Sequence, residues 1–264
     1  MKSADFDHLI HRLLGQTPPR VWSLLVTMFG DLALAPDARL SGACVNALTA
    51  AIGIKPEATR VALHRLRKEG WIESQRVGRQ SRYGLTNLGR SETQAARPRV
   101  YATGSPDTYP VVALDDPSTA MVAEDKGLGH TTVRIGPHCV VTLDTARADT
   151  DLVLTMTPSD RVPNWVAEKL CPTEVQTASA ALETRFRSLV DTHELAALTV
   201  LQRTALRVSV VHEWRRLILR VPDFPDHLFS EGWRGPACRG LLHDLLTALP
   251  APNLSDLEDH LGDT

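Results

Sequence analysis

Apolar side chains in the first third of the chain recur every three or four positions, which is the spacing of one face of an α-helix. This pattern predicts one helix within residues 6–14, a second from Pro18 to Phe29 and a third, shorter one from Leu40 to Ile52. A fourth helix is predicted from Pro56 to Gly70, because proline suits the first turn of a helix and glycine suits its end. The chain therefore opens with a group of short helices.

The pattern changes to that of a β-hairpin after the fourth helix. Two strand-like segments, residues 71–76 and 82–86, flank the tip Val77-Gly-Arg-Gln-Ser81. A glycine in such a tip favours a tight turn. Thr86 or Asn87 can then cap a further helix, which we expect to reach Ala96.

Composition and periodicity divide the remainder into two more segments. Residues 97–107 are too rich in Pro, Gly and Ser to continue a helix, so we expect a connector there. Strand candidates follow at residues 110–114, 131–135, 139–143 and 152–156, with helix candidates at 118–125 and 160–170. The rest is mostly helical. We predict an α+β protein with three domains, at residues 1–97, 108–172 and 173–264.

The net charge of −2 conceals a difference between two parts of the chain. Residues 1–97 hold 14 Lys and Arg against 8 Asp and Glu, a balance of +6, whereas residues 98–264 hold 15 against 23, a balance of −8. Residues 55–90 alone hold 9 basic against 3 acidic side chains. This excess predicts an anionic partner for the first domain and not for the others.

The cationic side chains of the predicted fourth helix share one face, and its apolar side chains lie on the opposite face. Those cations are Arg60, His64, Arg67 and Lys68. A short helix, a glycine turn, a basic-faced helix and a basic-tipped hairpin follow the order of a winged helix-turn-helix. We expect the basic helix to enter the major groove of DNA, where arginine binds guanine through two hydrogen bonds.

Three further arginines, Arg76, Arg79 and Arg82, belong to the predicted hairpin and suit contacts with phosphates or the adjacent groove. A charged helix face is also common on proteins that bind no nucleic acid. A winged helix that serves as a protein-interaction scaffold is therefore the alternative to DNA binding. The order of the elements and the local charge excess favour DNA.

Two separated groups of residues resemble one known family. The segment RVALHRLRKEGW, residues 60–71, precedes Gly78-Arg79 and the run YGLTNLG at residues 83–89. Far downstream, HEWRR at residues 212–216 precedes Pro222-Asp-Phe-Pro225 and Trp233-Arg-Gly235. In this order they resemble the PaaX-like regulators, the phenylacetic acid degradation repressor family.

The resemblance implies a winged-helix domain, a middle domain with the ferredoxin-like fold of Cas2 nucleases, and a helical third domain. It also implies a cytoplasmic repressor of a catabolic operon. Such a repressor binds double-stranded operator DNA as a homodimer and is released by an acyl- or aryl-CoA effector such as phenylacetyl-CoA. This chain departs from the family pattern at Val221-Pro222, where the family commonly has Asp-Pro, and at Leu182, where an aromatic is common.

His212, Arg215 and Arg216 form a weak effector-binding candidate. Arginines suit bidentate contacts with the phosphates of a CoA. In the alternative, His212 forms a hydrogen bond inside a helical bundle while the arginines pair with Asp223 or Asp226. We favour this structural role for the three side chains.

Evidence of catalysis or of metal binding is weak. The chain lacks GxSxG, GxGxxG, Walker-type and HExxH motifs, so we expect no enzyme activity and no cofactor. Asp115-Asp116 resembles the acidic position of Cas2-type nucleases, but this pair is also ordinary turn chemistry. His8 and His11 lack a third metal ligand.

Cys44 lies in an apolar stretch typical of a core. No segment is apolar enough to span a membrane or serve as a signal peptide.

Overall fold

The computed structural model describes residues 3–15, 19–118, 130–144, 152–157 and 160–262, which form an α+β protein with two antiparallel sheets. The chain folds into two compact units. Unit 1 comprises Met1–Val100, Thr184–Arg215 and Gly240–Thr264, and unit 2 comprises Tyr101–Glu183 and Arg216–Arg239. These units cut across the three sequence segments, because the helical third segment contributes to both. The three-domain division stays a prediction.

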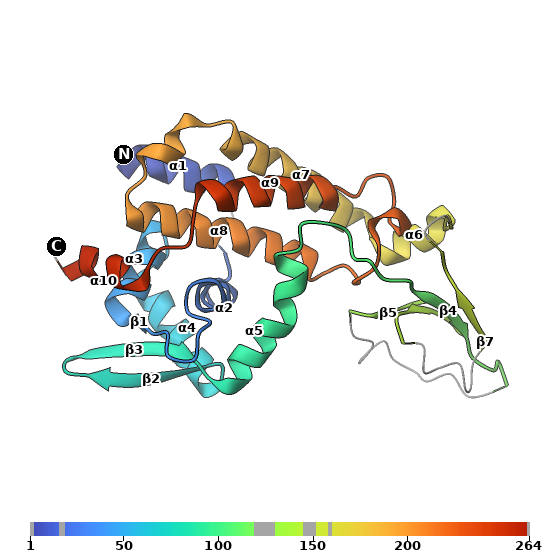
Figure 1. Ribbon diagram of the computed structural model, residues 1–264, viewed down its shortest axis with the longest axis horizontal. Helices are drawn as coiled ribbons and strands as arrows, with labels where there is room; N and C mark the ends of the chain where they lie inside the picture. Colours follow the sequence, from blue (N-terminus) through green and yellow to red (C-terminus); the bar gives the residue numbers. More distant parts are fainter. Residues whose placement is uncertain (1–2, 16–18, 119–129, 145–151, 158–159, 263–264) are drawn as a thin grey trace. The chain divides into compact units, whose positions relative to one another are not determined.

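Unit 1 begins with the expected helices and hairpin (Figure 1). The elements are α1 (Ser3–Leu14), α2 (Val21–Leu32), β1 (Leu40–Ser41), α3 (Gly42–Ala51), α4 (Pro56–Lys68), β2 (Ile72–Val77), β3 (Gln80–Leu85) and α5 (Asn87–Val100). The expectation of a helix from Leu40 was wrong by two residues. Leu40 and Ser41 instead pair with Tyr83 and Arg82 of β3, which makes a three-stranded sheet in the order β1-β3-β2.

Side-chain caps set the starts of two of these helices. Ser41 Oγ accepts a hydrogen bond from the backbone N–H of Cys44 at 3.0 Å, and Thr86 Oγ1 accepts one from Gly89 at 3.1 Å. Both bonds satisfy N–H groups that lack a partner in the first turn of a helix. A Cβ on Gly89 would overlap the carbonyl oxygen of Trp71, so only glycine allows α5 to start this close to the end of α4.

The expected connector begins later than the sequence indicates. The helix α5 continues through Pro98 to Val100, although proline removes one helical hydrogen bond. Long-range contacts support this last turn, since Arg97 Nη1 donates to the carbonyl of Gly30 at 3.3 Å and Trp214 Nε1 donates to that of Val100 at 2.9 Å. Arg99 and Val100 are buried. Tertiary contacts thus override the local signal of Pro98.

Helices from the third segment complete unit 1. The last part of α7 (Thr173–Val190) and most of α8 (Val200–Ile218) belong to it, as do the end of α9 (Gly235–Ala248) and α10 (Leu254–Gly262). A short 3-10 helix, His193–Ala197, joins α7 to α8. Trp214, Phe186 and Phe29 are among the largest fully buried side chains. α10 contacts α3 and β1.

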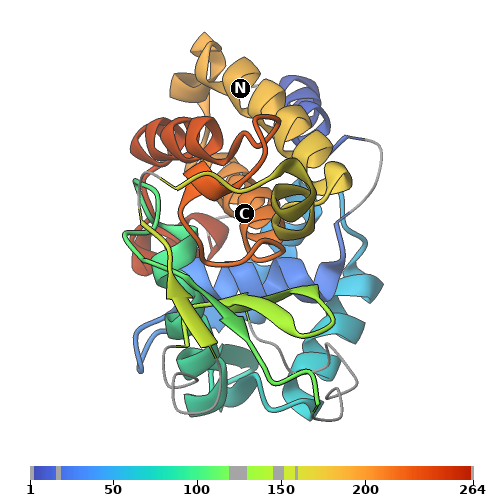
Figure 2. The ribbon, with the colours of Figure 1, turned by 90° about the vertical axis from the view of Figure 1, so that its right-hand side faces the viewer.

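Unit 2 contains the second sheet, in which all neighbouring strands are antiparallel (Figure 2). Its strands are β4 (Val111–Leu114), β5 (Thr132–Gly136), β6 (Cys139–Thr142) and β7 (Leu152–Thr155), in the order β5-β6-β4-β7. They confirm the four predicted strands to within about one residue. The helix α6 (Asn164–Leu170) confirms the later helix candidate but starts four residues after the predicted Asp160. Residues 119–125 of the earlier candidate lie outside the described residues, and Ser118 forms a turn.

The Trp233-Arg-Gly235 motif closes a polar and aromatic cluster in unit 2. Asp226 accepts hydrogen bonds from Trp233 Nε1 at 2.7 Å and from the guanidinium of Arg239. The Trp233 ring packs edge-on against Phe229, with 5.6 Å between ring centroids. A Cβ on Gly235 would overlap the Trp233 ring. The tryptophan and the glycine two residues later therefore serve the packing of the Trp233 ring.

Candidate nucleic-acid interface

The helix α4 is amphipathic because its apolar residues lie against the core of unit 1. Ala62, Leu63 and Leu66 are buried. Thr59 Oγ1 also donates to Thr49 Oγ1 of α3 at 3.0 Å, a buried hydrogen bond that fixes α4 against α3. Pro56 occupies the first turn, and the helix is followed by Gly70 at φ 74°, a backbone conformation that favours glycine.

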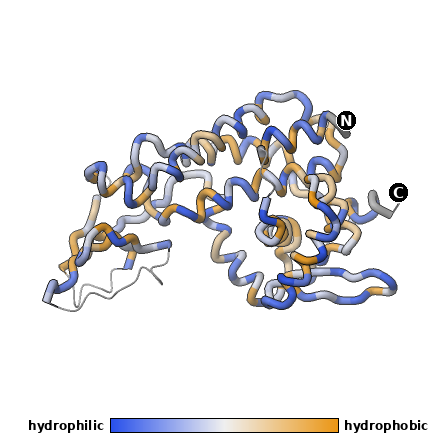
Figure 3. Tube along the Cα trace, turned by 180° about the vertical axis from the view of Figure 1, so that it is seen from behind, coloured by the Kyte–Doolittle hydropathy of each residue, from blue (hydrophilic) through white to orange (hydrophobic). Residues whose placement is uncertain are grey.

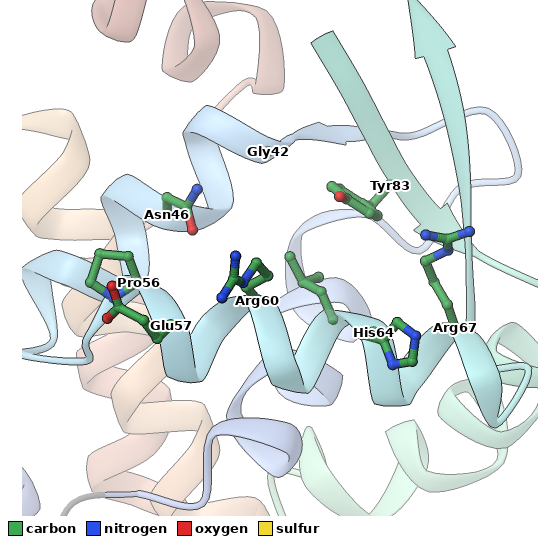
Figure 4. Close-up of a pocket in the computed structure, with 9 residues that line it drawn as sticks. Gly42, Asn46, Pro56, Glu57, Arg60, His64, Arg67 and Tyr83 are labelled. Atoms are coloured by element: carbon green, nitrogen blue, oxygen red, sulfur yellow. The ribbon is translucent and has the colours of Figure 1, made fainter.

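The opposite face of α4 presents the predicted cations to solvent. Arg60, His64, Arg67 and Lys68 are all exposed. The first three line a shallow hollow of about 390 Å³ between α3, α4 and β3 (Figure 4). The structure therefore brings Arg60, His64 and Arg67 together, while Lys68 does not line the hollow.

Three polar residues of this hollow were not among the predicted site residues. Glu57 lies one turn before Arg60 on α4, Asn46 comes from α3 and Tyr83 from β3. A helical projection already places Glu57 on the same face as Arg60, so the sequence held a signal for it. Asn46 and Tyr83 reach the hollow only through the packing of other elements, and no local pattern identifies them.

Two arginines close to the hollow, Arg65 and Arg39, are paired, in contrast to those that line it. Arg65 Nε lies 2.7 Å from Glu69 Oε1, and its guanidinium lies over the ring of Trp22, which itself donates to Glu69 Oε2 at 2.8 Å. The hydrogen bonds from Arg65 and then Trp22 lower the pKa of the Glu69 carboxyl. Arg39 pairs with Glu73 at 2.6 Å.

Arg60, His64 and Arg67 have no ion pair or hydrogen-bonded side-chain partner within the part of the chain that the structure describes. Positive charge without an internal partner is available to an external anion. This difference separates the cations of the hollow from a charged face whose side chains satisfy one another.

The hairpin β2–β3 lies on the outside of unit 1 and is mostly hydrophilic (Figures 1 and 3). Val77 pairs with Gln80, so that Gly78 and Arg79 alone form the tip, with Gly78 at φ 60°. Arg79 is exposed there. Arg76 is exposed but donates from Nε to the carbonyl of Gly78 at 3.3 Å, and Arg82 is half-buried opposite Gln75.

The predicted effector trio does not form one cluster of accessible cations. His212 is fully buried in unit 1, and its Nδ1 lies 3.2 Å from Thr27 Oγ1 of α2. Arg215 is half-buried and ends a segment of unit 1, whereas Arg216 is exposed and begins a segment of unit 2. Asp226, one of the two acids considered as partners of these arginines, binds Trp233 Nε1 and the guanidinium of Arg239.

The acidic pair at the end of β4 has the geometry of a turn. Asp116 Oδ1 accepts a hydrogen bond from the backbone N–H of Ser118 at 2.8 Å, and this bond lowers the pKa of Asp116. Asp115 Oδ1 lies 3.2 Å from His138 Nδ1. Among the residues that the structure describes, no three His, Cys, Asp or Glu side chains group as metal ligands. His8 and His11 are exposed on α1.

Comparison with known proteins first defines the class: the chain is a transcriptional regulator. It is 24% identical over 262 residues to the "Transcriptional repressor PaaX" of Escherichia coli (strain K12), with 90% of this chain and 83% of that protein covered. A family model described as "PaaX-like protein" matches residues 20–89, and one described as "PaaX-like protein C-terminal domain" matches residues 173–255. The chain belongs to the PaaX-like family.

The two matched regions cover the elements that carry the recognised motifs. Residues 20–89 include α2 to β3 and hence every predicted DNA-contacting side chain, and residues 173–255 include α7, α8 and α9. The strands of the second sheet lie between the two matched regions. Within the described residues, no helix combines the length and the apolar character needed to cross a membrane.

Proposed function

We propose that this regulator represses a catabolic operon by binding operator DNA through α4 and the β2–β3 hairpin. One observation carries the proposal: Arg60, His64 and Arg67 are exposed around one hollow without internal partners, while Arg65 and Arg39 are paired elsewhere. The relative from Escherichia coli is described as a transcriptional repressor, which supports the sign of regulation. Operator DNA supplies the anionic partner that the unpaired cations require.

The arrangement of unit 1 supports a winged helix-turn-helix. In this interpretation α3 is the first helix of the motif, α4 is the recognition helix and β2–β3 is the wing. The order β5-β6-β4-β7, with every neighbouring pair antiparallel, supports the ferredoxin-like interpretation of the middle segment. It corresponds to strands two, three, one and four of that fold.

The cations take different roles in the proposed complex. Arg60 and Arg67 extend from α4 toward base edges in the major groove, where arginine reads guanine. His64 lies between them on the same face. Lys68, Arg76, Arg79 and Arg82 lie toward the end of α4 and on the wing, and they contact phosphates.

Binding measurements with a matched control test this proposal. Arg60→Ala and Arg67→Ala should each cost about 1–3 kcal/mol on the operator and flatten its preference over random DNA. Arg65→Ala removes a cation from the same helix that is already paired with Glu69 and should leave that preference unchanged. If Arg60→Ala and Arg67→Ala both bind like the parent, the basic face is only a solvated surface. A protein-interaction scaffold would then be the better interpretation.

We also propose that an acyl- or aryl-CoA such as phenylacetyl-CoA releases the repressor, and that the repressor is a homodimer. Membership of the PaaX-like family supports the class of effector. A ligand that binds only the folded protein stabilises it by about 2.7 kcal/mol at a hundredfold excess over Kd. Thermal unfolding with a panel of CoA thioesters should reveal a stabiliser that also releases DNA, and ultracentrifugation should show two chains per particle. No shift with any thioester would remove this effector class.

A further inference from the structure

The hollow beside α4 contains one acidic side chain among the cations that line it. Of its nine lining residues, only Glu57 carries negative charge. Glu57 is exposed in the first turn of α4, three residues before Arg60 on the same helix face (Figure 4). Within the described residues, neither Glu57 nor Arg60 forms an ion pair, so the two side chains do not neutralise each other.

An acid in this position opposes a purely electrostatic attraction to DNA. A carboxylate beside the phosphates lowers affinity for every sequence alike. It stabilises the positive N-terminal end of α4, and this alone explains an acid in the first turn. That role does not, however, require the side chain to line the same hollow as Arg60. The hollow lies at the N-terminal part of the proposed recognition helix, where base contacts concentrate.

We infer that Glu57 is a specificity-determining residue that selects cytosine in the operator. In the major groove the cytosine N4 amino group is a donor, and a carboxylate accepts its hydrogen bond. Guanine O6 and thymine O4 are acceptors, which the carboxylate repels. Adenine also has a donor, N6, but its N7 acceptor lies beside that donor and repels the carboxylate. Glu57 therefore favours cytosine over adenine and disfavours guanine and thymine, at a position close to the guanine that Arg60 reads. This inference rests on the proposed DNA binding of α4.

Glu57 can improve sequence discrimination by repelling the wrong bases, which a cation cannot do in the same way. Discrimination is a difference of two affinities, so an interaction that penalises the wrong sequence improves it as much as one that rewards the right sequence. Arg60 and Arg67 supply attraction to all DNA through their charge. Glu57 reduces binding to sequences that lack the cytosine and thereby widens the ratio between specific and random sites.

Selection from a pool of duplexes with a randomised centre tests the role of Glu57 in the full-length protein. The parent should enrich a site with a cytosine at one position. Glu57→Ala should lose the preference there, and Glu57→Gln should shift it toward adenine, which glutamine reads through N6 and N7. Replacing that cytosine should weaken parent binding about fivefold to a hundredfold and leave Glu57→Ala nearly unaffected.

A matched control separates base recognition from charge. Glu92→Gln removes one exposed negative charge from α5, which does not line the hollow, and it should enrich the parental site unchanged. If both Glu57 variants enrich the parental site with the same base profile, Glu57 acts only on the end of α4 and the inference is wrong. A parent that enriches no sequence at all would instead remove the proposed DNA binding, which is a different result.

Discussion

Arg207 and Asp31 lie 176 residues apart in the chain and form a buried two-point ion pair. Arg207 Nε is 2.7 Å from Asp31 Oδ2, and Nη2 is 2.9 Å from Oδ1. The third donor, Nη1, binds the carbonyl of Leu249 at 2.8 Å. One guanidinium therefore joins α2, α8 and the end of α9 within unit 1. The helix α2, which precedes the basic hollow in the chain, is thus held by residues of the family's C-terminal region.

We predict that loss of one partner of this pair destabilises the protein strongly. Arg207→Met removes one partner of this buried ion pair and should cost about 3–5 kcal/mol of the free energy of unfolding, measured by urea denaturation. Arg207→Met combined with Asp31→Leu removes both charges and should recover most of this loss. If Arg207→Met alone is as stable as the parent, solvent or another side chain must take the place of Arg207 beside Asp31.

We predict that the wing arginine contributes affinity without sequence preference. Arg79 lies at the exposed tip of the hairpin, where a phosphate contact requires no particular base. Arg79→Ala should weaken selected and random duplexes to the same extent and lower the salt slope by about one unit for the lost phosphate contact. Anisotropy titrations at three salt concentrations measure this slope. A selective loss on the chosen duplex would instead assign Arg79 to base reading.

We predict that α10 positions the DNA-binding unit through Glu258. Its Oε1 accepts a hydrogen bond from the backbone N–H of Ser41 at 2.7 Å, and Ser41 both caps α3 and pairs with Arg82. Glu258→Ala should weaken binding to a selected duplex several-fold, about 1 kcal/mol, with the salt slope unchanged because no phosphate contact is lost.

Glu258→Gln should restore most of this binding, since its amide oxygen still accepts from Ser41. Asp259→Ala serves as the charge control, because Asp259 is exposed on the same helix. If Asp259→Ala and Glu258→Ala change binding equally, the effect comes from the negative charge of α10 and the positioning role is wrong.

We predict that Cys139 is the first cysteine to react in the folded protein. Burial, together with the nearby Glu258, raises the pKa of Cys44 to about 12, and burial raises that of Cys171 to about 12. At pH 8 only about one in ten thousand of such thiols is the reactive thiolate. The pKa of Cys139 is raised as well, but this side chain is only half-buried. Labelling followed by peptide mass spectrometry should place the label first on Cys139.

The same pKa shifts set the pH dependence of stability. The folded pKa of Cys44 lies above its ordinary value of 9.0, so the thiol's contribution is complete below about pH 9 and is lost as the pH rises toward 12. Stability should therefore fall over that alkaline range, and Cys44→Ala should reduce the fall. If Cys44 is labelled in the folded protein as fast as Cys139, the burial of Cys44 is contradicted.

Sequence alone determined the local elements of this protein and the chemistry of its basic face. Helical spacing, Pro56 and Gly70 are sufficient to predict α4, and the glycine at position 78 marks the hairpin tip. The exposed cations Arg60 and Arg67 follow from the same projection. All of these signals lie within one or two turns of the chain, where side-chain spacing reflects backbone geometry directly.

Tertiary structure alone decided which distant residues meet these elements. Asn46 and Tyr83 reach the hollow from other elements, and His212 lies against Thr27 across 185 residues of sequence. The continuation of α5 through Pro98 also depends on long-range contacts rather than on local preference. A contact between distant residues leaves no periodic trace in the sequence, because it depends on how whole helices pack and not on the spacing within any one of them.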